Sequence, residues 1–483
     1  MINVELRRGV SASRLTMFTV AGLLIMSSLN SPAAHGRDSA APVSVDAWIA
    51  RDGLPFTVAS PATFIKSVDK AVASLGPSVE LLGFGEALHG GQEILQLRNE
   101  LFKHLVMTKG FSAIAIESSF ARAWLVNDYV TGNGPATYDE VMDKGFSEGV
   151  GHLTANRELV EWMRTYNADP SHPVKLHFYA FDIPTGAVGI ASPAHVLHVA
   201  LEYLGAIDPA AANEHRQKID SLLPADAAWE NPMAWADTKQ AIGGSPAATS
   251  LRIATEDLIT ELRTRRPELV AHSSEDRYLQ ALHNAVVARE LLNFHAVLAR
   301  KSGEPPAGPR GIRDALMADN LVYIVDRERG HGRVMVFAHN GHLQRGKSTW
   351  PCCGQKYLGT DVYTWWPAGS QLQQMLGDRY AVIGTAVGES QQNEIARPEA
   401  GSLEARLTAQ KETGLLIQTH GGRGIASDEV AGLPTRSGSM LNLTYTALVP
   451  QSFTDFNWLC VLDSVTYSQG GKPLSHWDNS PKK

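Results

Sequence analysis

The stretch from Leu81 to Glu117 constrains the fold of this chain more than any other. Short apolar runs at 79–83 and 112–116 are typical of strands buried in a parallel sheet. Between them lie a Gly-rich turn, at 84–91, and a segment whose apolar residues follow the i, i+3, i+4 spacing of a core-facing helix. A β-α-β unit of this kind is right-handed, so both strands end at the same edge of the sheet.

Titratable side chains follow several predicted strands at the point where each strand ends. Further apolar runs at 174–180 and 333–338 predict two more strands of the same sheet. The residues that follow the four strand ends are Glu86 with His89, Glu117, Asp182, and His339 with His342. Because open α/β folds place their ligands at the carboxyl ends of the strands, we expect one acid-base site there.

The hydrophobic pattern divides the chain into two halves of an α/β body, residues 44–190 and 310–470, and an insertion at 191–302. The insertion shows long helical patterns and no strand pattern. Strands predicted at 379–385 and 457–465 complete the sheet, residues 386–440 are weakly patterned, and the tail after Gly470 is expected to be frayed. The fold class is therefore α/β: a mostly parallel central sheet flanked by helices, with a large all-helical insertion.

Residues 1–34 have the features of a secretory signal peptide. Arg7, Arg8 and Arg14 form a positive region, and the apolar run at 15–26 is too short to span a bilayer comfortably. We expect cleavage and a periplasmic or secreted mature protein with no membrane span; a single N-terminal anchor is the alternative. The formal net charge of −7 argues against a nucleic-acid partner.

The chain has three cysteines, too few for a disulfide framework. A bond between the adjacent Cys352 and Cys353 would be strained, so a link from either of them to Cys460 is the better disulfide hypothesis. Three ordinary thiols remain the alternative. The sequence gives no indication of the oligomeric state.

Three kinds of chemistry compete for the cluster. A dinucleotide-binding loop is disfavoured, because its fingerprint requires glycine where Leu88 stands and Glu86 would repel a pyrophosphate. A metal site built from His339 and His342 with Glu86 or His89 stays open, although no helical HExxH motif occurs. Activation of water by an imidazole beside a carboxylate fits best, and the lack of a G-x-S-x-G motif disfavours a serine nucleophile.

Six motifs are spread over most of the chain, from about Glu80 to Val465. They are Gly85-Glu86-x-x-His89-Gly90, Leu97-Arg98, Gly110-Phe111 to Glu117, Asn156-Arg157-Glu158 through Asn167, Arg313-Asp314-x-x-Met317-Ala318-x-Asn320, and Ala338-His339-Asn340-Gly341-His342. In order and spacing these motifs resemble those of the erythromycin esterase family. Leu88 and Gly91 depart from the small hydroxyl residues usual around the motif histidine, and both would reshape the floor of a pocket.

The resemblance implies hydrolysis of an ester or a macrolide lactone by activated water, without a covalent enzyme intermediate. We expect no cofactor and assign no metal ligand. It implies His89 as the general base with Glu86 beside it, Glu117 and Arg98 completing the polar cluster, and His339 with His342 on the opposite wall. For Arg98 we weigh charge stabilisation against an ion pair with Glu117 or Glu86. The expected substrate-binding residues are Asn340, Arg313 and Asp182.

Two other functions stay open at this point. The same fold can serve a non-catalytic ligand-binding protein or one acting in envelope or polysaccharide biogenesis. A metal-dependent hydrolase is the third possibility.

Overall fold

The computed structural model describes residues 41–147, 149–183, 190–235, 237–300, 308–350, 363–439 and 441–474. The predicted signal peptide lies outside this range, as do Cys352 and Cys353. Cys460 is described and lies fully buried in the last strand of the sheet, so the proposed disulfide stays a prediction.

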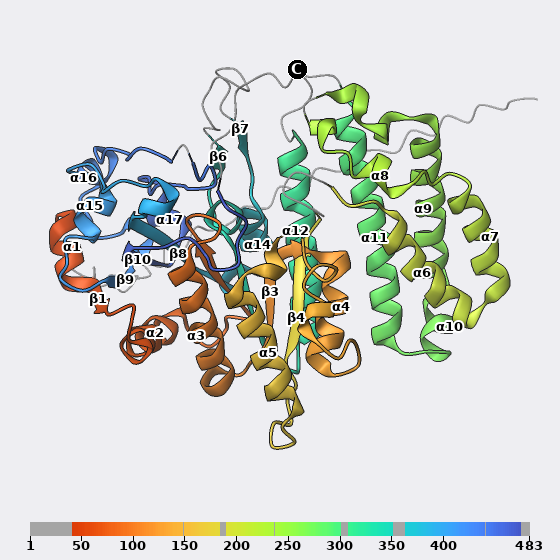
Figure 1. Ribbon diagram of the computed structural model, residues 1–483, viewed down its shortest axis with the longest axis horizontal. Helices are drawn as coiled ribbons and strands as arrows, with labels where there is room; N and C mark the ends of the chain where they lie inside the picture. Colours follow the sequence, from red (N-terminus) through yellow and green to blue (C-terminus); the bar gives the residue numbers. More distant parts are fainter. Residues whose placement is uncertain are drawn as a thin grey trace, which may run out of the picture. The chain divides into compact units, whose positions relative to one another are not determined.

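Within the described residues, eight strands form one sheet in the order β1-β9-β10-β8-β2-β5-β3-β4 (Figure 1). Neighbouring strands from β10 to β4 pair in parallel, whereas β9 is antiparallel to both β10 and β1. The strands are β1 (Gly53–Phe56), β2 (Leu81–Glu86), β3 (Phe111–Ser119), β4 (His177–Asp182), β5 (Arg333–His339), β8 (Tyr380–Glu389), β9 (Gly414–Gln418) and β10 (Trp458–Ser464). A separate antiparallel pair consists of β6 (Ser348–Trp350) and β7 (Tyr363–Trp365).

Helices cover both faces of the sheet. Alternate residues of a strand point to opposite sides, so each central strand contributes to two apolar cores. In β5, Met335 and Phe337 belong to one apolar core, and Val334 and Val336 belong to the other. The first core includes residues of α2 (Pro61–Leu75), α3 (Gln92–Lys109), α4 (Phe120–Thr131) and α5 (Thr154–Ala168). The second includes residues of α1 (Val45–Asp52), α12 (Gly308–Glu328), α14 (Ala368–Leu376), α15 (Leu403–Leu407) and α17 (Ser452–Asp455), and Val430 of α16 (Ser427–Ala431) packs against it.

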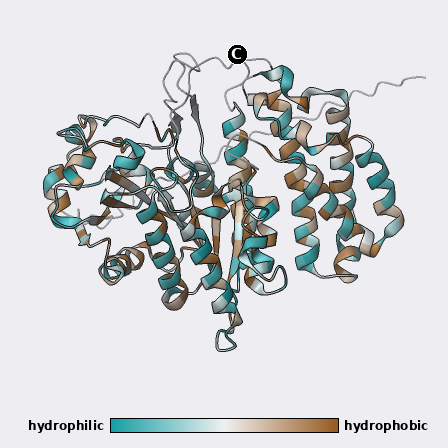
Figure 2. Cartoon of the chain, in the orientation of Figure 1, coloured by the Kyte–Doolittle hydropathy of each residue, from teal (hydrophilic) through white to brown (hydrophobic). Residues whose placement is uncertain are grey.

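A third apolar core belongs to the helices between β4 and α12. Figure 1 shows these helices gathered on the β4 side of the sheet, where α11 packs against α12 and α12 packs on β4. Figure 2 shows both hydrophobic and hydrophilic residues along these helices. Helices that bury one side in a bundle have such a mixed composition. The helices are α6 (Ala194–Ile207), α7 (Pro209–Asp220), α8 (Asp226–Trp229), α9 (Pro246–Thr264), α10 (Arg266–Ala271) and α11 (Glu275–Leu298).

The structure confirms the predicted fold class and adds two strands to the predicted sheet. Residues 53–56, where no strand was predicted, form edge strand β1, and the weakly patterned region contains β9, its partner. The tail predicted to be frayed after Gly470 is described only to residue 474, and Gly471, Lys472 and Leu474 line a cavity. No helix in the described part of the chain is long and apolar enough to cross a membrane.

Candidate active site

The site begins at the turn between β2 and α3, which carries His89. Gly90 in this turn has φ +78°, and a Cβ there would lie 2.8 Å from the ring of Tyr467, so glycine is required for two reasons. On one side the backbone N–H of Ser468 donates to the Gly90 carbonyl (2.8 Å). On the other, the backbone N–H of His89 donates to Thr444 Oγ1 (2.8 Å). Two segments distant in sequence therefore fix the position of His89.

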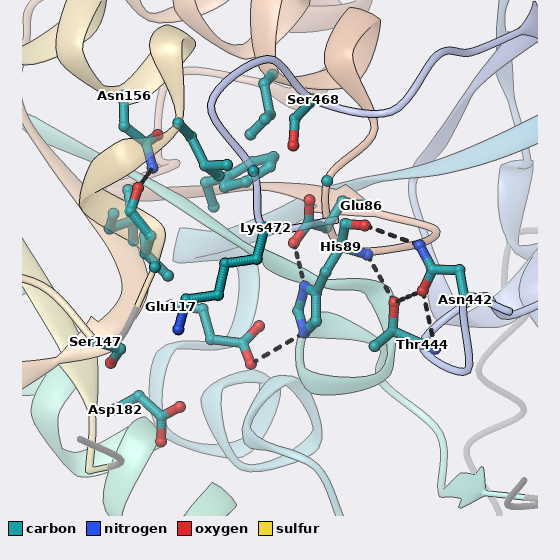
Figure 3. Close-up of a pocket in the computed structure, with 18 of the residues that line it drawn as sticks. Glu86, His89, Glu117, Ser147, Asn156, Asp182, Asn442, Thr444, Ser468 and Lys472 are labelled. Atoms are coloured by element: carbon teal, nitrogen blue, oxygen red, sulfur yellow. Dashed lines mark hydrogen bonds and ion pairs between the residues drawn. The ribbon is translucent and has the colours of Figure 1, made fainter. Parts of the chain in front are cut away.

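A cavity of about 460 Å³ opens at the carboxyl ends of β2, β3 and β4. That volume is within the usual range for small-molecule sites. Figure 3 shows His89 with its ring between Glu86 and Glu117. The predicted site residues that line the cavity are Glu86, His89, Arg98, Glu117, Asp182 and Arg313.

His89 and Glu86 form a close imidazole–carboxylate pair. His89 Nδ1 lies 2.5 Å from Glu86 Oε1 and donates a hydrogen bond to this buried carboxylate. This contact directs Nε2 toward the cavity, where 47% of the His89 side chain is exposed. The cavity walls alone would lower the pKa of His89, but the carboxylates of Glu117 and Glu86 outweigh them and raise it to about 9. Burial raises the pKa of Glu86.

Glu117 contacts three basic side chains of the site. Its Oε1 lies 3.8 Å from His89 Nε2, 3.4 Å from His342 Nε2 and 3.0 Å from Arg313 Nη2. Burial favours the neutral carboxyl, but the positive charges of His342, His89 and Arg313 hold the pKa of Glu117 well below its ordinary value. Glu117 therefore stays ionised beside His89.

Arg313 and Asp182 form the base of this network. The Arg313 guanidinium donates through both Nε and Nη2 to Asp182, the first contact measuring 2.9 Å, and reaches Glu117 with Nη2. Such a two-point contact fixes the orientation of the guanidinium as well as its distance. Arg313 and Asp182 both line the cavity as predicted. Because they form an ion pair, their opposite charges largely compensate each other.

Arg98 is a buried cation that borders the cavity. Its side chain is 1% exposed, donates to Asn99 Oδ1 (2.8 and 3.0 Å) and lies over the Phe337 ring at 4.8 Å. Among the described residues no carboxylate lies within ion-pair distance of it, so the structure contains neither of the predicted ion pairs with Glu117 and Glu86. Burial lowers the pKa of Arg98 to about 10.

Three predicted site residues do not line the cavity. Both ring nitrogens of His339 are used by the backbone, because Nδ1 accepts from the Gly341 N–H (3.1 Å) and Nε2 donates to the Thr444 carbonyl (2.7 Å). Burial and the charge of His89 lower the pKa of His339 to about 3, so it is neutral. His342 Nε2 contacts Glu117 at 3.4 Å from outside the cavity lining. Burial would lower the pKa of His342, but Asp314 and Glu117 raise it to about 10.

Asn340 likewise faces away from the cavity. Its amide donates to the Thr385 carbonyl (2.7 Å) and accepts from the Thr385 N–H (3.1 Å), which ties the residue after β5 to β8. Gly85 has no Cβ, and a Cβ there would lie 2.2 Å from Asn340 Oδ1, which explains the small residue at this position. The expected wall of His339 and His342 and the expected substrate contact of Asn340 are therefore corrected.

Leu88 is fully buried in the core and, like Gly91, lies outside the lining of the cavity, so neither forms its floor as expected. In the part of the chain that the structure describes, no group of three or more His, Cys, Asp or Glu side chains is placed to hold a metal ion.

Several lining residues were not predicted to belong to the site. Asn442 and Thr444 hold the turn of His89, and Lys472 reaches from the C-terminal segment toward Glu117 (Figure 3). Asn156 was found only as part of a motif, and Ser468 not at all. All except Asn156 come from segments without helix or strand periodicity, so no pattern in the sequence places them near His89.

Sequence comparisons relate this chain to known proteins. The sequence profile of the erythromycin esterase family matches residues 106–455. The curated "Erythromycin esterase type II" of Escherichia coli is 24% identical over 347 residues, which cover 70% of this chain and 75% of that protein.

Solved structures share the fold. A Bacillus cereus protein superposes with a TM-score of 0.68 at 20% identity, covering 89% of this chain and 98% of that one. A succinoglycan biosynthesis protein gives 0.65 at 17% identity, with 88% and 97% coverage. A mutant of the erythromycin esterase EreC in its open conformation gives 0.63 at 15% identity, with 86% and 98% coverage.

Proposed function

The chain belongs to the erythromycin esterase family and is a hydrolase acting on ester bonds, and from that premise we propose that it hydrolyses its ester with a water molecule activated by His89. This proposal rests on the orientation of the His89 ring. His89 Nδ1 is engaged by Glu86 at 2.5 Å, and Nε2 faces a cavity of about 460 Å³. A general base must reach the proton it removes, and Nε2 is the nitrogen with that access.

The reaction needs one water and no covalent intermediate. Nε2 of neutral His89 takes a proton from the water as its oxygen attacks the ester carbon. The imidazolium then gives this proton to the departing alkoxide, so that ester and water become acid and alcohol. Glu86 keeps the ring in the required tautomer and stabilises the imidazolium, as a carboxylate beside a catalytic histidine does.

Glu117 has the second role beside the ring. Because its Oε1 lies 3.8 Å from His89 Nε2, one water can hydrogen-bond to both atoms. The ionised carboxylate also stabilises the positive charge that His89 gains when it accepts the proton. Arg313 and His342 keep Glu117 ionised and in place.

Arg98 supplies the cation for the oxyanion that forms when water attacks. It borders the cavity and no carboxylate neutralises it within ion-pair distance in the described residues. A fixed cation in a site of low polarity stabilises developing negative charge more strongly than water would.

We propose a macrolide lactone as one substrate class, alongside simple carboxylic esters. The support is the name of the Escherichia coli relative, an erythromycin esterase. The test is incubation of the purified mature protein with erythromycin and with a panel of esters, followed by mass spectrometry for the gain of one water. Turnover that persists unchanged in His89→Ala would remove the proposed base.

We also propose export to the periplasm or beyond. The support is the arrangement of basic and apolar residues in positions 1–34. Cell fractionation with N-terminal sequencing tests it: a mature chain that begins near residue 35 in the periplasm or medium is expected, and a full-length cytoplasmic chain would contradict it.

A further inference from the structure

Two buried polar atoms on the cavity wall lack hydrogen-bond partners among the described residues. Asn156 is 2% exposed, and its Nδ2 donates to the Val150 carbonyl (2.8 Å) while Oδ1 has no partner. Ser468 is 4% exposed, and its Oγ also has none. Both residues line the cavity that His89 faces (Figure 3). Leaving a buried polar atom unpaired is costly, so such atoms in a ligand cavity indicate where a ligand completes the hydrogen bonds.

Asn156 and Ser468 are far apart in the sequence, but the segments that carry them contact each other. The Thr154 N–H donates to the carbonyl of Gln469 (2.9 Å), which joins the start of α5 to the C-terminal segment. Gly470, with φ +80°, allows this approach, because a Cβ there would lie 2.0 Å from the His152 carbonyl oxygen. The same segment is tied to the turn of His89, since the Ser468 N–H donates to Gly90. The wall is therefore fixed relative to the proposed base.

The chemistry of the two atoms limits what can bind there. An amide oxygen such as Asn156 Oδ1 only accepts, so its partner must be a donor, whereas a serine hydroxyl both donates and accepts. Arg98 lines the same cavity, and its Nη2 lies 3.4 Å from the carbonyl of Ala155, the residue before Asn156. A cationic donor such as an ammonium would be repelled by this buried guanidinium, and a neutral hydroxyl would not.

We propose that Asn156 and Ser468 form a subsite that recognises hydroxyl groups on the substrate, so that the preferred substrates are esters of polyols or sugars. This inference rests on the proposed esterase function and adds the substrate class to it. Asn156 Oδ1 accepts from one substrate hydroxyl, and Ser468 Oγ exchanges a hydrogen bond with the same or a neighbouring one. Neither residue touches the reacting bond; they position the substrate.

The test compares two probes with similar skeletons, methyl 6-O-acetyl-β-D-glucopyranoside and cyclohexylmethyl acetate, of which only the first carries ring hydroxyls. The variants are Asn156→Leu and Ser468→Ala in the full mature chain. Asn284→Leu is the matched control, because Asn284 is also buried, also donates from Nδ2 to one backbone carbonyl and also has an unpartnered Oδ1, but does not line the cavity.

Each subsite variant is expected to lower kcat/KM for the sugar ester about tenfold, mainly through KM, and to change it less than about twofold for the cyclohexyl ester. The control should not discriminate between the probes. Equal losses on both probes, or no loss on the sugar ester, would overturn the subsite while leaving ester hydrolysis intact. Because Ser468→Ala removes a single hydroxyl oxygen that bonds to no described residue, it remains informative even where Asn156→Leu fails to fold.

Binding without turnover separates the subsite from the reaction. Calorimetry with methyl β-D-glucopyranoside should show binding to the unaltered protein that weakens about tenfold in each subsite variant and not in Asn284→Leu. Absence of hydrolysis with this binding pattern would remove the proposed function and keep the subsite. Binding that is undetectable, or equal in all variants, would overturn the subsite.

Discussion

Two glutamate–histidine pairs lie at opposite ends of the same sheet, and they differ in what their surroundings leave open. At the carboxyl end His89 Nδ1 lies 2.5 Å from Glu86, and at the amino end His177 Nδ1 lies 2.7 Å from Glu328. Glu328 also accepts from the hydroxyls of Tyr179 (2.7 Å) and Ser112 (2.6 Å), which satisfies both of its oxygens. Only the pair at the carboxyl end borders the cavity.

The electrostatics of the two carboxylates follow from this difference. Burial raises the pKa of Glu86, and the charge and hydrogen bond of His89 do not fully compensate. Burial acts on Glu328 as well, but the hydrogen bonds of His177, Ser112 and Tyr179 outweigh it and lower the pKa of that carboxyl. The same pair of residue types is thus a reactive centre where it is incompletely satisfied and a structural anchor where it is fully satisfied.

The largest expected effect separates the two histidines. His89→Ala should reduce kcat by about 10³-fold or more, because positioned general bases contribute about 10²–10⁴-fold. His177→Ala should leave the activity per folded molecule within about twofold. Steady-state kinetics on both variants, corrected for the folded fraction by circular dichroism, checks this; similar losses in the two would break the comparison.

Arg98 gives the next largest effect. Arg98→Gln should lower kcat about 10²-fold with a smaller change in KM, since the cation acts on charge that develops during the reaction. Arg436→Gln is the control: Arg436 is also buried and donates to backbone carbonyls, but it lies outside the cavity lining. A loss confined to KM in Arg98→Gln would assign Arg98 to ground-state binding.

Glu328→Gln tests the structural pair through stability. It should cost about 3 kcal/mol of unfolding free energy, because hydrogen bonds to a charged group contribute about 1.5–3 kcal/mol each and are not additive. The pKa of Glu328 is lowered in the folded protein, so its contribution is present above its unfolded pKa and is lost as the pH falls through the folded value. Urea titrations at several acidic pH values should therefore show a weaker acid-side decline in the variant than in the unaltered protein.

The smallest effect concerns Glu86. Glu86→Gln keeps an oxygen that can accept from His89 Nδ1 but removes one of the two carboxylates that raise the pKa of His89. In this variant the pH at which the rate rises should move to lower values. A pH-rate profile of the variant and of the unaltered protein checks the direction of this shift. A shift to higher pH would mean that Glu86 does not act on His89 by its charge.

The sequence predicted the centre of the sheet better than its edge. β2, β3 and β5 are continuous apolar runs, which periodicity detects. β1 has four residues including Pro55, and β9 lies in a Gly- and Thr-rich region, so both depend on pairing with each other rather than on their own pattern.

The site was predicted where strand ends deliver it and missed where loops do. Glu86, His89 and Glu117 follow strands that run in parallel, so their meeting follows from the topology. Side-chain direction does not follow from it, which is why His339 was expected to line the cavity although its ring nitrogens bond to the backbone. Ser468 and Lys472 reach the cavity only through contacts hundreds of residues apart along the chain, such as the one between Gly90 and Ser468, and no local pattern encodes those.

The most direct test of the account measures kcat/KM against pH and titrates His89 in the same protein by nuclear magnetic resonance. A general base must be unprotonated, and the pKa of His89 is raised to about 9 by Glu117 and Glu86 after the opposing effect of burial. We expect kcat/KM to rise with pH, to reach half of its maximum near pH 9 and to level off above that pH, with the same apparent pKa in both measurements. A rate that falls as His89 loses its proton would contradict it.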